Sequence, residues 1–272
     1  MSEEVGIVDT YLRMVPNKTL LIPLPDPLLI THVVADYVVK RLKMAPIAYL
    51  SLGGPQPVMY SLGGVAVRPF SLYFSGREPL VVFKTSPKVK EAAAARLFAK
   101  ASAALVRWAE RNEFDKVVML DVKGEREGES VYFTTEEHYA KEMRDMGFEP
   151  FSGLMASEAA ILLDECMRSR VTGVLLLVGS KSLAKYEEVM ERIRREGRYS
   201  ERDLEELMEL ATRFEADAAR RAIEAISRVS GVEIPLDKFD EHVREFEKAA
   251  CAVLEELFKT RIRGRPPPTM IR

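Results

Sequence analysis

The chain has 272 residues, 47% of them hydrophobic, with 40 basic and 42 acidic side chains and a net charge of -2. This composition provides enough apolar surface for a substantial core, and the balanced charge gives no general sign of a nucleic-acid-binding protein. The sequence has no run of about eighteen apolar residues, which a membrane-spanning helix needs, and its start lacks the apolar segment of a secretory signal. We therefore expect a cytoplasmic protein.

Amide side chains are scarce, because the sequence holds only Asn17, Asn112 and Gln56, whereas 30% of the residues are charged. Amides deamidate at high temperature and ion-pair networks gain value there, so the composition predicts a thermophilic source. Two cysteines, Cys166 and Cys251, are too few for a disulfide framework or a zinc site. Buried thiols are the simpler interpretation, with a single disulfide as the alternative.

The first half of the chain alternates between strand and helix patterns. Thr19–Leu24 is a short apolar run ended by prolines and predicts a buried strand, and Leu28–Leu42 has the apolar spacing of an amphipathic helix. Short apolar runs separated by glycine or proline predict a meander of strands over Ile47–Thr85. An alanine-rich helix is expected over Val89–Arg111, followed by a buried strand over Lys116–Val122.

The alternation continues with a strand over Val131–Thr134, helices over Glu136–Met146 and Ser157–Arg168, and a strand over Gly173–Val178. Strands that alternate with helices favour a largely parallel sheet with helices on both faces. We therefore predict one α/β domain over residues 1–272, built as three α/β/α layers around a mostly parallel sheet.

Charged helices are expected to close the chain, over Leu183–Glu196, Ser200–Ser227 and Leu236–Lys259. Residues 181–215 predict a helical protrusion with Gly197 in its turn. In that protrusion, apolar residues of the first helix would pack on apolar residues of the second: Leu183, Tyr186, Met190 and Ile193 on Leu204, Leu207, Leu210, Ala211 and Phe214. Residues 261–272 are rich in arginine and proline, and three successive prolines predict an extended tail.

The sequence contains no recognisable catalytic constellation. His32, His138 and His242 lie far apart and outside the zinc-binding patterns, and no glycine-rich phosphate-binding motif occurs. We therefore predict no catalytic residue, no metal and no cofactor.

Two segments lie where strands of the predicted sheet end, which is the usual position of a ligand crevice in α/β proteins. Lys84, Thr85 and Ser86 precede a helix, and Asp121 and Lys123 end a buried strand. Hydroxyl groups before a helix and a lysine can hold an anion, so these five residues form the candidate crevice. Helix capping and a solvated charged loop are the alternative interpretations.

Three ordered segments carry a resemblance to a known family. Leu20–Leu42 reads as a strand, a Leu-Pro turn and a helix; Phe151–Gly179 as a Gly-Leu segment, a helix ending in arginine and a buried strand; Ala219–Lys248 as a closing pair of helices. Together they resemble the proteasome assembly chaperone family, in its archaeal branch, whose members are homologues of the second eukaryotic assembly chaperone. The resemblance covers most of Thr19–Thr260.

This resemblance implies a fold similar to that of purine nucleoside phosphorylases without known catalysis, a homo-oligomer, and proteasome core subunits as partners. Some members bind the core through a C-terminal hydrophobic–tyrosine–any-residue tail, whose counterpart here is Met270, Ile271 and Arg272. The chain departs from the family at Ile271, where tyrosine is expected, and at Asp121–Glu125, which replaces a glycine-rich segment with mostly charged residues. Residues 181–215 are longer and more charged than usual and predict an insertion.

Three functions stay open at this point. The first is a proteasome-associated chaperone or adaptor, and the second is an enzyme or binder acting on a nucleoside or another small metabolite. The third is a nucleic-acid binder that uses the basic residues near the C-terminus: Lys259, Arg261, Arg263, Arg265 and Arg272. The sequence favours the first, because few polar residues converge at strand ends and five basic residues without interleaved aromatics bind nucleic acid weakly.

Overall fold

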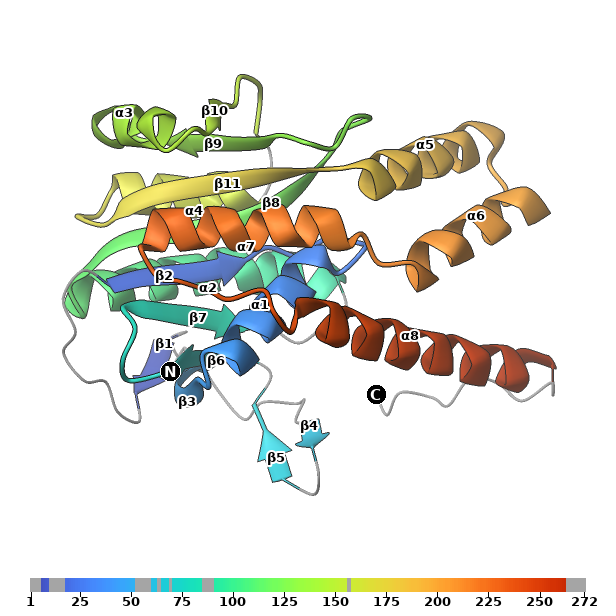
Figure 1. Ribbon diagram of the computed structural model, residues 1–272, viewed down its shortest axis with the longest axis horizontal. Helices are drawn as coiled ribbons and strands as arrows, with labels where there is room; N and C mark the ends of the chain where they lie inside the picture. The colour runs from blue at the N-terminus through green and yellow to red at the C-terminus, as the bar shows by residue number, and fades with distance from the viewer. Residues whose placement is uncertain are drawn as a thin grey trace.

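The computed structural model describes residues 6–9, 18–51, 60–62, 65–68, 70–84, 91–155 and 158–262. Its strands are β1 (Gly6–Asp9), β2 (Lys18–Pro23), β3 (Ala45–Ser51), β4 (Tyr60–Leu62), β5 (Val65–Val67), β6 (Ser71–Phe74), β7 (Leu80–Lys84), β8 (Phe114–Gly124), β9 (Val131–Thr135), β10 (Glu149–Pro150) and β11 (Thr172–Ser180). Strands β4 and β5 form a hairpin apart from a nine-stranded sheet, whose spatial order is β1-β3-β6-β7-β2-β8-β11-β9-β10 (Figure 1).

The sheet is mixed, so the prediction of a mostly parallel sheet is not confirmed: parallel pairing is found in its centre and between β9 and the edge strand β10. Strands β7, β2, β8 and β11 are parallel neighbours, whereas β1, β3, β6 and β7 pair antiparallel, as do β9 and β11. The short connection between β6 and β7 explains why these two strands are antiparallel, because a parallel pairing needs a crossover of a dozen or more residues. The similarity to purine nucleoside phosphorylases stays a prediction.

Helices cover both faces of this sheet. They are α1 (Ile30–Arg41), α2 (Glu91–Arg111), α3 (Glu137–Asp145), α4 (Glu158–Met167), α5 (Lys181–Glu196), α6 (Glu201–Thr212), α7 (Ala216–Ser230) and α8 (Phe239–Ile262). One apolar core joins the sheet to α1, α3 and α7, and a second joins the opposite face to α2 and α4. Trp108 of α2 is fully buried in the second core, with its ring 5.2 Å from that of Phe114.

The predicted helix over Ser200–Ser227 is two helices, α6 and α7, separated at Arg213–Glu215. Arg213 is extended, and the backbone N–H of Phe214 donates to the Glu247 carboxylate at 3.1 Å. Gly197 ends α5 in the left-handed conformation that the predicted turn requires (φ 68°). Helix α8 continues to Ile262, so the rest of the predicted extended tail, residues 263–272, lies outside the described residues.

Helices α5 and α6 and the end of α8 reach past the carboxyl ends of the parallel strands (Figure 1). No described helix combines the length and apolar character that crossing a membrane requires. Both cysteines are free thiols, and the prediction of buried thiols is correct for Cys166 but wrong for Cys251, which is exposed.

Candidate partner-binding surface

The candidate crevice residues do not gather at one place. Lys84 forms an ion pair with Asp36 of α1 and so faces the layer of α1 and α7. Asp121 follows Val117 and Met119 in the strand alternation, so its side chain lies on the opposite face, towards α2 and α4. Thr85 and Ser86 lie outside the described residues.

Asp121 lies in acidic surroundings. The backbone N–H of Val122 donates to its Oδ1 at 2.8 Å. Burial raises the pKa of Asp121 to about 6, and the negative charges of Asp26 and Glu158 act in the same direction. An anionic ligand here would meet carboxylates, which disfavours a phosphate site.

Lys123 is engaged by aromatic rings near the same strand end. Its ammonium lies 4.7 Å from the ring centre of Tyr132 and 5.4 Å from that of Phe151. Such contacts stabilise a cation on a ring face and hold it there. Asp121 and Lys123 both lie near the end of β8, and within the described part of the chain they do not form an ion pair with each other.

The start of α1 is occupied by the chain's own carboxylate. Asp26 accepts hydrogen bonds from the backbone N–H groups of Leu28, Ile30 and Thr31 at 3.0, 3.0 and 2.9 Å, and from the Thr31 hydroxyl at 2.9 Å. A helix N-terminus behind a strand is where many α/β proteins bind phosphate. Here the position that a ligand anion would take is filled by Asp26.

The start of α5, directly after β11, is filled in the same way. Glu215 accepts from the backbone N–H groups of Lys181 and Ser182, at 3.1 and 2.8 Å, and from the Ser180 hydroxyl at 2.6 Å. Neither carboxylate was predicted from the sequence. Asp26 carries a local signal, an acidic residue just before a helical pattern, whereas Glu215 lies more than thirty residues from the helix it caps.

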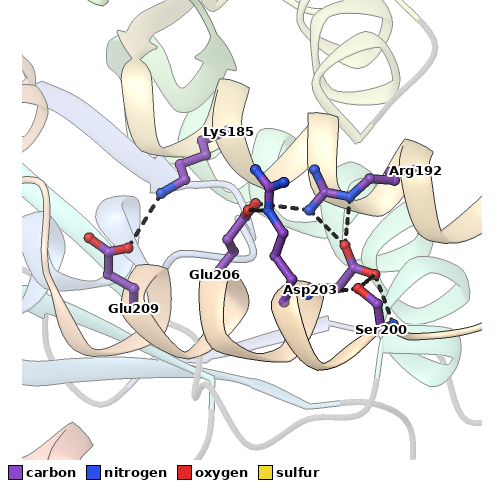
Figure 2. A network of polar contacts seen from close by, with 7 residues as sticks. Lys185, Arg192, Ser200, Asp203, Glu206 and Glu209 are labelled. Atoms are coloured by element: carbon purple, nitrogen blue, oxygen red, sulfur yellow. Dashed lines mark hydrogen bonds and ion pairs between the residues drawn. The ribbon is translucent and has the colours of Figure 1, made fainter.

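Helices α5 and α6 form a hairpin held by a polar network, which we call the hairpin network (Figure 2). The Arg192 guanidinium donates to Asp203 at 2.6 Å and to Glu206 at 2.9 Å. Ser200 and Asp203 form a capping box, with the backbone N–H of Ser200 donating to Asp203 at 2.9 Å. Lys185 and Glu209 add an ion pair at 3.4 Å. Two helices are thereby joined by charged groups rather than by an apolar seam alone.

The Asp203 side chain is inaccessible to water although it lies on a thin, outlying hairpin. The Ser200 hydroxyl, the Ser200 backbone N–H and the Arg192 guanidinium together lower the pKa of Asp203 to about 2. The carboxylate therefore stays charged at neutral pH and keeps all its hydrogen bonds.

The outer face of α6 exposes apolar side chains to solvent. Leu204 is 49% exposed and Met208 39% exposed, and Tyr199 before the helix is 59% exposed. The predicted packing of Leu204 and Ala211 against α5 is wrong, because both are exposed. Asp203 and Glu206 take the positions that face α5, which turns Leu204 outwards.

The rest of the predicted seam does face inwards. Leu183 and Ile193 of α5 are buried, and Met190, Leu207, Leu210 and Phe214 are half-buried.

Among the described residues no group of histidine, cysteine or acidic side chains is arranged to hold a metal ion. Leu204 and Met208 lie one turn apart on α6, so its outer face is an exposed apolar surface that suits a protein partner.

The chain is similar to several proteins of known structure. Pyrococcus furiosus PbaA, described as an archaeal homolog of proteasome-assembly chaperone, superposes with a TM-score of 0.67 at 18% identity, covering 94% of this chain and 99% of its own. Pyrococcus furiosus PbaB, described as an archaeal proteasome activator, gives a TM-score of 0.64 at 16% identity, covering 92% and 99%. A PAC2 family protein from Streptomyces avermitilis gives 0.51 at 14% identity, covering 86% and 95%.

These identities establish a shared fold and no more. No curated protein matches the chain significantly. The family model for the PAC2 family matches residues 20–254, which is most of the chain and includes the sheet except β1 and the start of β2, the hairpin and the larger part of α8. The protein therefore belongs to the PAC2 family.

Proposed function

We propose that the protein is an assembly chaperone or adaptor of the proteasome core, which acts as a homo-oligomer and without catalysis. The observation that carries the proposal is the exposed apolar face of α6, formed by Leu204 and Met208 on a hairpin that the hairpin network stiffens. Apolar side chains held on a rigid helix suit a protein interface. PbaA and PbaB share the fold and are described as a proteasome-assembly chaperone homolog and a proteasome activator, so we take the proteasome as the partner.

The N-termini of α1 and α5 are occupied by carboxylates of the chain itself, which supports a function that does not involve binding a phosphate group. Strands β2, β8 and β11 are neighbours in the centre of the sheet. Helix α1 follows β2 and helix α5 follows β11, and an internal carboxylate caps the start of each helix. Phosphate and nucleotide groups commonly bind at such helix starts in α/β proteins. Binding phosphate here would require the displacement of Asp26 or Glu215.

The C-terminal residues Met270, Ile271 and Arg272 are the proposed docking element for the proteasome core. An apolar pair beside a free carboxylate suits a pocket that holds a basic residue. In a homo-oligomer several tails act together, so avidity offsets the missing tyrosine at position 271. The same proposal places the protein in the cytoplasm of a thermophilic archaeon, in line with its composition.

The decisive experiment is cosedimentation with purified core proteasome. We expect Leu204→Asp with Met208→Asp to abolish cosedimentation, and deletion of Met270–Arg272 to weaken it, whereas Ile271→Tyr strengthens it. Ile161→Asp with Met167→Asp is the matched control, since these apolar residues of α4 are also exposed. Equal cosedimentation of all variants, or none by the intact protein, contradicts the proposal.

Self-association is tested separately by light scattering. We expect a particle several times larger than the 30.7 kDa chain at micromolar concentration. A particle of 30.7 kDa would leave the adaptor function standing but remove avidity from the argument.

A metabolite-binding function has one observation in its favour. Asp121 is half-buried at a strand end and its pKa is raised, and a protonated carboxyl can donate a hydrogen bond to an uncharged ligand such as a nucleoside. Titration calorimetry with nucleosides, using wild type, Asp121→Ala and Asp121→Asn, tests this second candidate. Binding that Asp121→Ala removes and Asp121→Asn retains would favour it over the adaptor, because the asparagine amide still donates a hydrogen bond.

A further inference from the structure

The exposed apolar side chains of α6 form one line along the helix. Leu204 and Met208 lie one turn apart, and both are exposed. Tyr199, also exposed, precedes the capping residue Ser200, and Leu204 is the fourth residue of the helix. Apolar side chains at these two positions commonly pack together at a helix start. From Ser200 to Met208 the helix rises about 12 Å, so these three apolar residues, which we call the α6 stripe, cover about two turns.

Two carboxylates edge the α6 stripe along one side. Glu201 precedes Leu204 by three residues, and Glu205 precedes Met208 by the same spacing. Residues three apart on a helix are neighbours on its surface. Both carboxylates are exposed, and no ion pair in the part of the chain that the structure describes involves either of them. They therefore remain available to a partner that covers the stripe.

The other acidic side chains of α6 do not belong to this edge. Asp203 and Glu206 bind Arg192 of α5. Glu209 forms an ion pair with a lysine of the same helix. Figure 2 shows all three carboxylates turned towards α5. The negative charge beside the α6 stripe is therefore that of the two edge carboxylates, and it is separate from the hairpin network.

The α6 stripe and its edge together define the chemistry of a partner. A helix presents its side chains in rows of residues four apart, and such a row packs into the groove of a second helix. Leu204 and Met208 are one row of this kind, and Glu201 and Glu205 are a parallel row next to it. A second helix is complementary to both rows when it carries an apolar row beside a row of lysine or arginine.

We propose that α6 binds an amphipathic helix of a partner protein, whose apolar side is edged by lysine or arginine residues. This inference rests on the proposed function, which names the proteasome core as the partner. The apolar rows form the buried centre of the contact, and the charged rows lie at its rim. Buried apolar anchors slow the dissociation of a complex, whereas rim charges speed its formation and make that rate depend on salt.

Two synthetic peptides test the chemistry without the proteasome. Both are helical and carry leucines four residues apart, and they differ only in the row beside the leucines, which is lysine in one and glutamate in the other. Fluorescence anisotropy with the full-length protein should show that the lysine-edged peptide binds about tenfold more tightly at low salt. Added salt should shrink the difference, because it screens exposed charges. Leu204→Asp with Met208→Asp should abolish the binding of both peptides.

Reversal of the edge charge should reverse the preference between the peptides. The variant is Glu201→Lys with Glu205→Lys, and its neutral counterpart, Glu201→Gln with Glu205→Gln, should bind both peptides about equally. The matched control is Glu241→Lys with Glu245→Lys, which makes the same change of charge at the same spacing on exposed positions of α8. The control should keep the wild-type preference.

Three outcomes of the peptide experiment overturn the proposal. They are no binding of either peptide by the wild type, equal affinity of the wild type for both, and the same preference in the edge variant as in the control. Light scattering on the same samples adds a fourth. A change of particle size in the edge variant alone would show that a second copy of the chain covers the stripe.

Association kinetics with purified core proteasome test the identity of the partner. Glu201→Lys with Glu205→Lys should associate about tenfold more slowly at low salt and dissociate at nearly the wild-type rate. If the substitution of Leu204 and Met208 abolishes binding and the edge variant associates at the wild-type rate, this inference fails and the proposed function stands. If the peptide preference is found and the intact protein does not bind the proteasome, the proposed function fails and the helix belongs to another protein.

Discussion

The body of the molecule and its α5–α6 hairpin are stabilised by different forces. In the body, β2, β8 and β11 are buried between two helical layers, and their side chains form two apolar cores. In the hairpin, the contacts between helices centre on Arg192, Asp203 and Glu206. Apolar burial depends little on pH or salt, whereas ion pairs depend on both.

Because of this difference, one part of the molecule can stabilise the fold while the other binds a partner. The body can supply the free energy of folding while the hairpin presents an apolar outer face that contributes little to it. A charged inner side leaves Leu204 and Met208 free for a partner without leaving the hairpin loose.

The largest effect is expected from Trp108→Ala in the body. The side chain is fully buried on α2, and truncation leaves a cavity that costs about 3–5 kcal/mol of unfolding free energy. Guanidinium-induced unfolding measures it, with exposed Arg107→Ala as the control. A loss below about 1 kcal/mol would mean that the second core is not the main source of stability.

The next effect is an increase in stability, expected from Asp121→Asn. Because burial raises the pKa of Asp121 to about 6, the folded protein binds a proton more tightly than the unfolded chain, so wild-type stability falls as pH rises from about 4 to about 6. Asparagine has no such charge, and we expect a gain of up to about 3 kcal/mol at pH 8. Exposed Asp115→Asn on the same strand is the control, expected within about 0.5 kcal/mol of wild type. Equal pH profiles for wild type and Asp121→Asn would contradict the argument.

A smaller effect is expected at the joint between body and hairpin. Glu215→Ala removes the acceptor of two backbone N–H groups at the start of α5, which should cost about 1–3 kcal/mol. Hydrogen exchange at Lys181 and Ser182 should quicken, whereas exposed Glu224→Ala on α7 should change neither quantity. Unchanged exchange would show that the cap is not needed to hold the hairpin.

The elements of the body could be predicted from the sequence because their signals are local. The apolar run of β2 and the helical spacing of α1 depend on neighbouring residues alone, and both elements lie where they were expected. Strand direction was harder, because pairing depends on connections between segments rather than on the pattern within each one.

The candidate site could be predicted only in part, for two physical reasons. Lys84 and Asp121 lie on opposite faces of the sheet. Which face each side chain takes depends on strand register, which the residue pattern does not determine in advance. The break before α7 depends on Glu215 reaching α5, a distant polar contact without a periodic signal. By contrast, the outward position of Leu204 was predictable, since Ser200 and Asp203 have the spacing of a capping box, which fixes the first turn of α6.

The smallest effect on global stability, and the sharpest test of the comparison, comes from the hairpin network. The folded-state pKa of Asp203 is lowered to about 2, so its stabilising effect is complete above the unfolded value of about 4 and is lost as pH falls to about 2. We expect hydrogen exchange in α6 to quicken across that window before exchange in β8 and β11 does.

Arg192→Gln should expose α6 to protease at neutral pH without moving the midpoint of global unfolding, because the apolar cores are unchanged. Arg194→Gln is the control, since Arg194 is exposed and pairs only within α5. If Arg192→Gln shifts the global midpoint as much as Trp108→Ala, the hairpin belongs to the cooperative core, and its outer face is not an independent platform for a partner.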